Sequence, residues 1–196
     1  MTEDRHKQRQ QKLKEQVDAR IDAAKEQRGI LIVFTGNGKG KTTAAFGTVT
    51  RAVGHGMRAA VIQFIKGEWP NGEKNLLEPH GVEFQVMATG FTWETQNKQT
   101  DTEACQAVWQ QGKRMLADTS LDLVVLDELT YMVSFGYLDL QDVIDALNAR
   151  PAHQTVIITG RGCHRDLLEM ADTVSELRPV KHAFDAGIMA QQGIDW

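Results

Sequence analysis

ILIVFTGNGKGKTT, residues 30–43, is an apolar run that leads through a glycine-rich turn into the start of a helix. The run 30–34 predicts a buried strand, and the residues after Gly40 predict the first turn of a helix. A glycine-rich turn in this setting binds phosphate, because its backbone N–H groups and the helix N-terminus both point at an anion. Lys41 then reaches the terminal phosphates, and the Thr42 hydroxyl is placed to meet a Mg²⁺. The sequence therefore predicts a phosphate-binding loop (P-loop) for a nucleoside triphosphate.

The loop departs from the usual P-loop pattern, G-x-x-x-x-G-K-[ST], at its first glycine. Counting back from Gly40 places that glycine at Thr35, and Lys39 adds a cation that the pattern does not require. The altered start leaves the orientation of the nucleotide open. A glycine-rich turn that binds nothing is the alternative, but such a turn does not need a Lys-Thr pair. We therefore expect the triphosphate to contact Gly36, Asn37, Gly38, Lys39, Gly40, Lys41, Thr42 and Thr43.

Length and composition favour a single globular α/β domain. The chain has 196 residues, of which 41% are hydrophobic and 24% charged, as in an ordinary globular protein. The net charge of −4 does not favour a nucleic-acid binder. Cys105 and Cys163 form no Cys-x-x-Cys pair, so we expect neither disulfides nor structural zinc, and we expect a cytoplasmic protein. The N-terminus is polar and no apolar run is long enough to cross a bilayer, so we expect no membrane contact.

Residues 1–28 differ from the rest of the chain. They hold eight Lys/Arg and six Asp/Glu with no Gly or Pro, and Leu13, Val17 and Ile21 recur every four residues. That spacing predicts an amphipathic helix with one narrow apolar stripe. The helix is either solvated throughout or a lid that docks over a site or a partner subunit. We expect residues 29–196 to form one P-loop nucleotide-binding α/β domain.

After the P-loop, strand patterns alternate with helix patterns. Further strands are expected at 58–65, 82–87, 121–126, 155–159 and 173–177, and helices at 41–54, 101–117 and 140–148, the last capped by Asp139. Such alternation predicts a mostly parallel sheet covered by helices on both faces. The polar stretch 66–75 is expected to be a loop, either a lid or a long connection. In sheets of this kind, ligands bind beyond the carboxyl ends of the strands.

Two carboxylates end one of the apolar strands. Leu123-Val124-Val125-Leu126 leads into Asp127 and Glu128, which would stand at the carboxyl edge of the sheet beside the P-loop. In a P-loop protein such acids hold Mg²⁺ directly or through water, so we assign the metal site to Thr42, Asp127 and Glu128. Which carboxylate touches the metal stays open, and a strand end that is merely solvated is the alternative.

Two further segments supply candidates at the same edge. Arg161, in Ile158-Thr159-Gly160-Arg161-Gly162, contacts phosphate or a second ligand, or is a solvated arginine of a tight turn. Phe91 and Trp93, in Thr89-Gly90-Phe91-Thr92-Trp93, follow the strand 82–87. The two rings can form an apolar platform for a large flat ligand, or one ring can fold into the core. The six histidines form no metal-spaced pair.

The motifs together resemble the ATP:corrinoid adenosyltransferases of the CobA/BtuR type. The resemblance is carried by residues 36–43, 61–67 (VIQFIKG), 89–93 and 126–128 (LDE), which occur in the family's order. It covers nearly the whole chain from about Gly29, and residues 1–28 look like the family's leading helix. It implies a RecA-like P-loop fold and a homodimer that acts in cobalamin biosynthesis. The implied reaction transfers the 5′-deoxyadenosyl group of ATP to Co(I) of a corrinoid and releases tripolyphosphate.

The resemblance also implies roles for the candidate residues. Lys41, Thr42 and Glu128 would be catalytic, because Lys41 and a Mg²⁺ stabilise the charge on the departing triphosphate. Phe91 and Trp93 would bind the corrinoid and displace an axial ligand of cobalt, and a flavoprotein would reduce the metal. Co(I) is itself the nucleophile, so no general base is required.

Other functions stay open on the residues alone. One is a general P-loop phosphotransferase or ATPase, in which the terminal phosphate is attacked. The other is a nucleotide switch or corrinoid carrier that binds without turnover. In the family that the chain resembles, ATP lies in the reverse sense along the loop, and the absence of a glycine at Thr35 is compatible with that arrangement.

Overall fold

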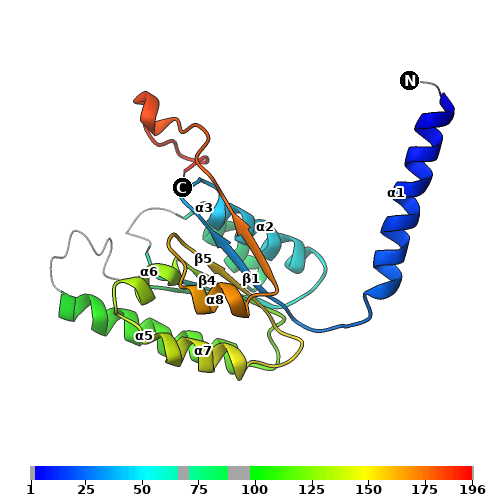
Figure 1. The fold of residues 1–196 in the computed structure, drawn as a ribbon. Coiled ribbons are helices and arrows are strands. Elements are labelled where there is room, and N and C mark those ends of the chain that lie inside the picture. Colours follow the sequence, from blue (N-terminus) through cyan, green and yellow to red (C-terminus); the bar gives the residue numbers. More distant parts are fainter. Residues whose placement is uncertain (1–2, 66–70, 88–97, 196) are drawn as a thin grey trace.

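A six-stranded, all-parallel β-sheet forms the centre of the molecule (Figure 1). The computed structural model describes residues 3–65, 71–87 and 98–195. Its strands are β1 Leu31–Thr35, β2 Ala59–Gln63, β3 Glu83–Val86, β4 Leu123–Asp127, β5 Thr155–Thr159 and β6 Thr173–Glu176. They lie in the order β3-β2-β4-β5-β1-β6. Each expected strand is present, and the sheet confirms the predicted α/β class with a parallel sheet.

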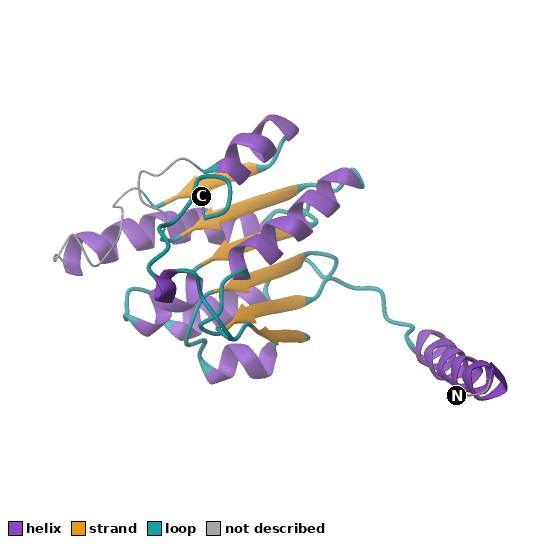
Figure 2. Ribbon diagram, turned by 90° about the horizontal axis from the view of Figure 1, so that it is seen from above, coloured by secondary structure: helices purple, strands orange, loops and turns teal. Residues whose placement is uncertain are grey.

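Helices cover both faces of the sheet (Figure 2). The helices of the described part are α1 Glu3–Ala23, which does not cover the sheet, and α2 Lys41–Gly54, α3 Gly72–Leu77, α5 Lys98–Ala117, α6 Leu129–Ser134, α7 Leu140–Asn148 and α8 Arg165–Met170, with 3₁₀ turns η1 Glu78–His80 and η2 Phe184–Ala186. α2 and α3 pack on one face, against strand residues such as Val61 and Val125. α5, α6, α7 and α8 pack on the other face, against the alternate strand residues, such as Ile62 and Leu126. The inner strands β1, β2, β4 and β5 are mostly apolar in sequence because helices cover them on both faces, whereas the edge strands β3 and β6 carry more polar residues.

The predicted loop at 66–75 is wrong in its second half, where α3 begins at Gly72. Asn71 caps this helix, and its side-chain oxygen accepts a hydrogen bond from the Lys74 N–H at 3.1 Å. Leu77 anchors the helix in the core. Residues 66–70 lie outside the described part. The short helices α6 and α8 were also not expected.

The strand register brings polar residues to one edge of the sheet. Gln63, the last residue of β2, pairs with Asp127, the last residue of β4. Thr159 ends β5 and pairs with Phe34 of β1, which leads into the P-loop. All of these residues stand at the carboxyl ends of parallel strands, where such sheets form ligand sites.

The helix α1 stands apart from the sheet (Figure 1). The side chains of its predicted apolar stripe, Leu13, Val17 and Ile21, are all exposed. The predicted helix is therefore present, while its role as a lid stays a prediction. None of the helices in the described ranges combines the length and the apolar character needed to span a membrane.

Arg28 ties the segment after α1 to the sheet. Its guanidinium donates to both carboxylate oxygens of Asp172, at 2.9 and 2.5 Å, and Asp172 also accepts from the Leu31 N–H at 2.9 Å. The Arg28 and Leu31 hydrogen bonds lower the pKa of Asp172 from 3.8 to about 2. These contacts fix the point at which the chain enters β1.

We expect Asp172→Asn to lower the free energy of unfolding by about 1 kcal/mol at neutral pH, a value that allows for the exposure of Arg28. Because the pKa of Asp172 is lower in the folded than in the unfolded protein, its contribution is present above about pH 4 and is lost as the pH falls toward 2. Urea unfolding across this range measures the effect, with Asp18→Asn in α1 as the control. A difference between Asp172→Asn and wild type that stays constant down to the acid end would contradict this assignment.

Candidate nucleotide site

The P-loop starts one residue later than the usual pattern because Thr35 is the last residue of β1. Thr35 pairs with Glu176 in the sheet, and its carbonyl accepts from the Leu177 N–H at 2.8 Å. The turn begins at Gly36, whose φ of 97° lies in the left-handed region that favours glycine. Gly38 donates its N–H to the Leu177 carbonyl at 2.7 Å, and a β-carbon on Gly38 would lie 2.7 Å from that carbonyl carbon. The glycines therefore let the loop sit against the segment that follows β6.

Lys41 opens α2 and is only 6% exposed. Its ammonium donates to the Gly38 carbonyl at 2.9 Å. Burial lowers the pKa of Lys41, the Glu128 carboxylate acts in the opposite direction, and Arg161 adds to the lowering. A partly desolvated ammonium at a helix N-terminus interacts more strongly with an incoming anion than an exposed one does.

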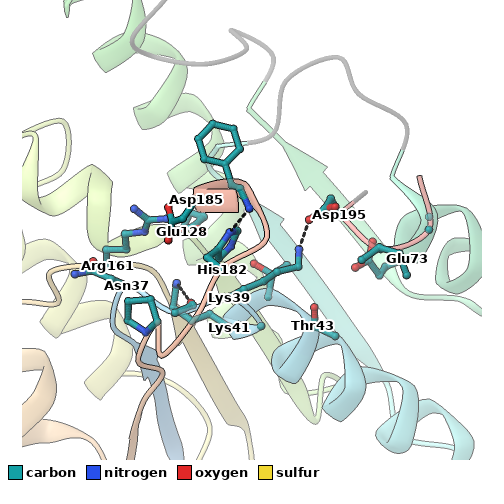
Figure 3. A pocket seen from close by; sticks show the side chains of 18 of the residues that line it. Asn37, Lys39, Lys41, Thr43, Glu73, Glu128, Arg161, His182, Asp185 and Asp195 are labelled. Carbon is teal, nitrogen blue, oxygen red and sulfur yellow. Dashed lines mark hydrogen bonds and ion pairs between the residues drawn. The ribbon is translucent and has the colours of Figure 1, made fainter. Parts of the chain in front are cut away.

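The P-loop forms part of the wall of a cavity of about 950 Å³ (Figure 3). All predicted triphosphate-binding residues line it except Gly36, and Arg161 lines it as well. Three residues of α3, Glu128 and part of the segment 179–195 complete the lining. Arg161 and Glu128 lie toward one end, whereas Glu73 and Asp195 lie toward the other (Figure 3). The cavity has the size of a site for a nucleotide-sized ligand. Its lining holds the cations Lys39, Lys41 and Arg161 and the carboxylates Glu73, Glu128, Asp185 and Asp195.

The two carboxylates at the end of β4 have different surroundings. Asp127 is buried and is not part of the cavity lining; it accepts from the Thr159 hydroxyl at 2.7 Å and from the Gln63 amide at 3.3 Å. Glu128 lines the cavity. Among the described residues other than glycine, Glu128 alone has a positive φ, 61°, and its N–H donates to the Thr159 hydroxyl at 2.9 Å. Of the predicted metal set, Thr42 and Glu128 therefore face the cavity, and Asp127 lies behind them.

Sequence comparisons identify the family. The family model described as ATP:corrinoid adenosyltransferase BtuR/CobO/CobP matches residues 27–196, and the model described as cob(I)alamin adenosyltransferase N terminal matches residues 1–21. The chain belongs to the ATP:corrinoid adenosyltransferases. The reaction class is therefore ATP-dependent adenosylation of a corrinoid, as the resemblance implied.

Named relatives of this adenosyltransferase match it over its whole length. The corrinoid adenosyltransferase CobA of Salmonella typhimurium is 76% identical over 196 residues, and the corrinoid adenosyltransferase of Escherichia coli strain K12 is 74% identical, each with 100% of both chains covered. The corrinoid adenosyltransferase of Pseudomonas aeruginosa is 48% identical over 98% of this chain and 96% of that one. The solved structure of the flagellar accessory protein FlaH from Methanocaldococcus jannaschii gives a TM-score of 0.45 at 11% identity over 76% of this chain and 71% of that chain, a likeness too distant to bear on function.

The residues predicted to bind the corrinoid of this adenosyltransferase, Phe91 and Trp93, lie outside the described part of the chain. The strand before them, β3, ends at Val86, beside β2 and at the same edge of the sheet as the P-loop. The contact of Phe91 and Trp93 with the corrinoid stays a prediction.

Part of the segment 179–195 lines the adenosyltransferase cavity, although no sequence pattern marks this segment. Lys39 pairs with Asp195 at 2.5 Å, and Asp195 also accepts from the Gln191 N–H at 2.8 Å. Phe184 and Ile194 add apolar side chains to the wall. The segment has little regular structure, so it lacks the periodicity by which helices and strands are found. The sequence signal that could have pointed to this segment is its apolar residues, such as Phe184 and Ile194, which follow neither helical nor strand spacing.

Proposed function

We propose that the cavity binds ATP by its triphosphate along residues 36–43 and releases that triphosphate intact as tripolyphosphate. The observation that carries the proposal is that Arg161, from the turn after β5, lines the same cavity as Lys41 of the P-loop. These two side chains can therefore place positive charge beside the phosphates, whereas Lys39 is paired with Asp195. Such charge stabilises a leaving group in the same way as it holds a substrate.

In the proposed reaction, Co(I) of the reduced corrinoid attacks carbon 5′ of the ribose with its own electron pair. The bond between carbon 5′ and oxygen breaks, and its electron pair stays on the α-phosphate oxygen of the departing triphosphate. Lys41, Arg161 and the loop amides stabilise this charge in our proposal. Because cobalt is the nucleophile, the protein has no proton to abstract. Its main task is to hold cobalt and carbon 5′ in line, an effect worth about 7–11 kcal/mol in well-oriented reactions.

The residues of the cavity fit a Mg²⁺ cofactor. Mg²⁺ usually takes one or two carboxylates together with substrate phosphates and water, and Thr42 and Glu128 both line the cavity. In the described part of the chain, no three His, Cys, Asp or Glu side chains lie together as a metal site, so the phosphates would supply further ligands. We propose that Thr42 and Glu128 hold the ion and that Asp127 supports them from behind. When bound, the ion offsets the negative charge of the triphosphate.

Further partners are proposed from the family resemblance. A corrinoid would lie against Phe91 and Trp93, a flavoprotein would reduce its cobalt, and two copies of the chain would form a homodimer. The exposed apolar stripe of α1 supports a role for this helix as a lid or a subunit contact. We place the enzyme in the cytoplasm, where a reducing environment suits the free thiols of Cys105 and Cys163.

The phosphate product tests the proposed reaction. Anaerobic incubation with ATP, Mg²⁺ and a chemically reduced corrinoid is expected to yield tripolyphosphate and a cobalt–carbon bond in equal amounts. Leaving out the reductant should suppress both products, because the nucleophile is then absent. A P-loop phosphotransferase would instead form ADP or orthophosphate. Either of these products without a cobalt–carbon bond would overturn the proposal.

A further inference from the structure

A line of buried polar side chains runs behind the cavity along the carboxyl edge of the sheet. Its members are Asn71, Gln63, Asp127 and Thr159, which are 7%, 0%, 2% and 0% exposed, and we call it the polar relay. They come from the N-cap of α3 and from the last residues of β2, β4 and β5. Buried polar groups need hydrogen-bond partners because water does not reach them. The members of the polar relay therefore constrain one another.

The hydrogen bonds on the α3 side of the polar relay have a fixed direction. Asn71 accepts from the Lys74 N–H through Oδ1, so its amide nitrogen is the end that donates to Gln63 Oε1, at 2.6 Å. Gln63 must then present its own amide nitrogen to Asp127 Oδ2, at 3.3 Å. Rotating either amide by 180° would bring two donors or two acceptors face to face. The placement of the N-cap of α3 is thus linked to Asp127.

On its other side, Asp127 is linked by hydrogen bonds to the backbone of Glu128 through the Thr159 hydroxyl. The Thr159 hydroxyl accepts from the Glu128 N–H at 2.9 Å and donates to Asp127 Oδ1 at 2.7 Å. The left-handed backbone of Glu128 is unfavourable for a residue with a β-carbon and persists only where its surroundings hold it. Thr159 supplies one such contact, and Asp127 in turn fixes the Thr159 hydroxyl.

Both ends of the polar relay meet the wall of the cavity. At one end, Asn71 caps α3, from which Gly72, Glu73 and Leu76 line the cavity. At the other end, Thr159 holds the backbone of Glu128, whose side chain also lines the cavity. Glu73 and Glu128 lie toward opposite ends of the cavity (Figure 3).

We propose that Gln63 and Asn71 are positioning residues for adenosyl transfer, which link the placement of α3 to that of Glu128 through Asp127. This inference rests on the proposed role of Glu128 beside Mg²⁺. Gln63 suits the task because its two ends are a donor and an acceptor that cannot exchange places without loss of a hydrogen bond. Glu128 and α3 are thereby set relative to each other before the nucleotide enters, so that little reorganisation is needed during the reaction.

Two substitutions that leave the net charge unchanged break the polar relay at different points. Asn71→Ser keeps an oxygen that can cap α3 but lacks the amide that reaches Gln63. Gln63→Met keeps a similar side-chain length and removes both the donor and the acceptor. The matched control is Gln154→Met, because Gln154 is also fully buried and its amide donates to three backbone carbonyls, but it precedes β5 at the opposite edge of the sheet.

Hydrogen exchange of backbone amides is the first readout, and it needs neither ligand nor turnover. We expect Asn71→Ser and Gln63→Met to speed exchange of the Glu128 amide about five- to tenfold, the range that corresponds to the loss of one hydrogen bond. Thr159→Val should speed exchange at Lys74, at the other end, by a similar factor. Thr159→Ser keeps the hydroxyl and should restore the wild-type exchange rate at Lys74. Gln154→Met should leave the exchange rates of the Glu128 and Lys74 amides as in wild type. If each residue of the polar relay acted only on its direct neighbours, a substitution at one end would leave the exchange rate of the amide at the other end unchanged.

The second readout is the Mg²⁺ dependence of turnover. Loss of a residue that supports a metal ligand commonly costs 10–100-fold, so we expect the half-maximal Mg²⁺ concentration to rise about tenfold in Asn71→Ser and Gln63→Met. The KM for the corrinoid should not change. Wild-type exchange at the Glu128 amide in both variants would overturn the inference even if their activity falls. Failure of the wild type to form tripolyphosphate would instead overturn the proposed reaction. The hydrogen-exchange rates would then still show whether the polar relay links α3 to Glu128.

Discussion

Lys41→Ala is expected to lower adenosyl transfer by about 10²–10³-fold, the usual cost of removing one donor that stabilises developing charge. Lys41 is the buried cation of the cavity, and its ammonium donates to the P-loop carbonyl of Gly38. Alanine leaves no charge at that point. ATP affinity should fall together with the rate, because the ammonium contacts the phosphates before the reaction as well as during it. Calorimetric titration with ATP and single-turnover kinetics measure the two effects.

Lys39→Ala is the matched control for this experiment. Lys39 also lines the cavity, but its side chain is 47% exposed and pairs with Asp195. Exposed ion pairs contribute little, so we expect less than about a tenfold loss. Corrinoid binding to the nucleotide-free protein should survive at least in part in Lys41→Ala. Normal ATP affinity in that variant would refute the role assigned to Lys41.

The sheet and the P-loop could be predicted because short stretches of sequence determine them. Strands buried on both faces need continuous apolar runs, and residues 30–34, 123–126 and 156–158 supply such runs within the expected strands. The helix α7 could be placed for a similar reason. Asp139 caps it as expected, and its carboxylate accepts from the Asp142 N–H at 3.0 Å. Each of these features depends on neighbours in the sequence.

Other parts of the site depend on contacts between distant residues and could not be predicted from local patterns. Leu177 seats the P-loop, and Asp195 pairs with Lys39, yet both follow the loop by more than a hundred residues in the sequence. The same holds for the two carboxylates of β4. Asp127 ends β4, whereas Glu128 follows it with a left-handed backbone, and contacts of both residues with Thr159 on a neighbouring strand hold Asp127 behind the cavity and Glu128 at its wall.

Glu128→Gln is the other large loss that we expect, about 10²-fold in turnover at a fixed, limiting Mg²⁺ concentration. Glutamine has nearly the size of glutamate, so the backbone N–H of residue 128 can still donate to Thr159 and the fold should be preserved. The amide lacks the negative charge that makes a carboxylate a good ligand for Mg²⁺. Since the defect is one of metal binding, a higher Mg²⁺ concentration should recover part of the turnover.

Glu73→Gln separates this effect from a general change in the charge of the cavity. Glu73 lines the same cavity from α3, so the substitution removes an equal charge but at the other end (Figure 3). Turnover of wild type and both variants is measured against Mg²⁺ concentration. We expect a displaced curve for Glu128→Gln and a curve close to that of wild type for Glu73→Gln. Coincident curves for Glu128→Gln and wild type would mean that the ion takes other protein ligands, and Asp127, which lies directly behind, would then be the first to replace.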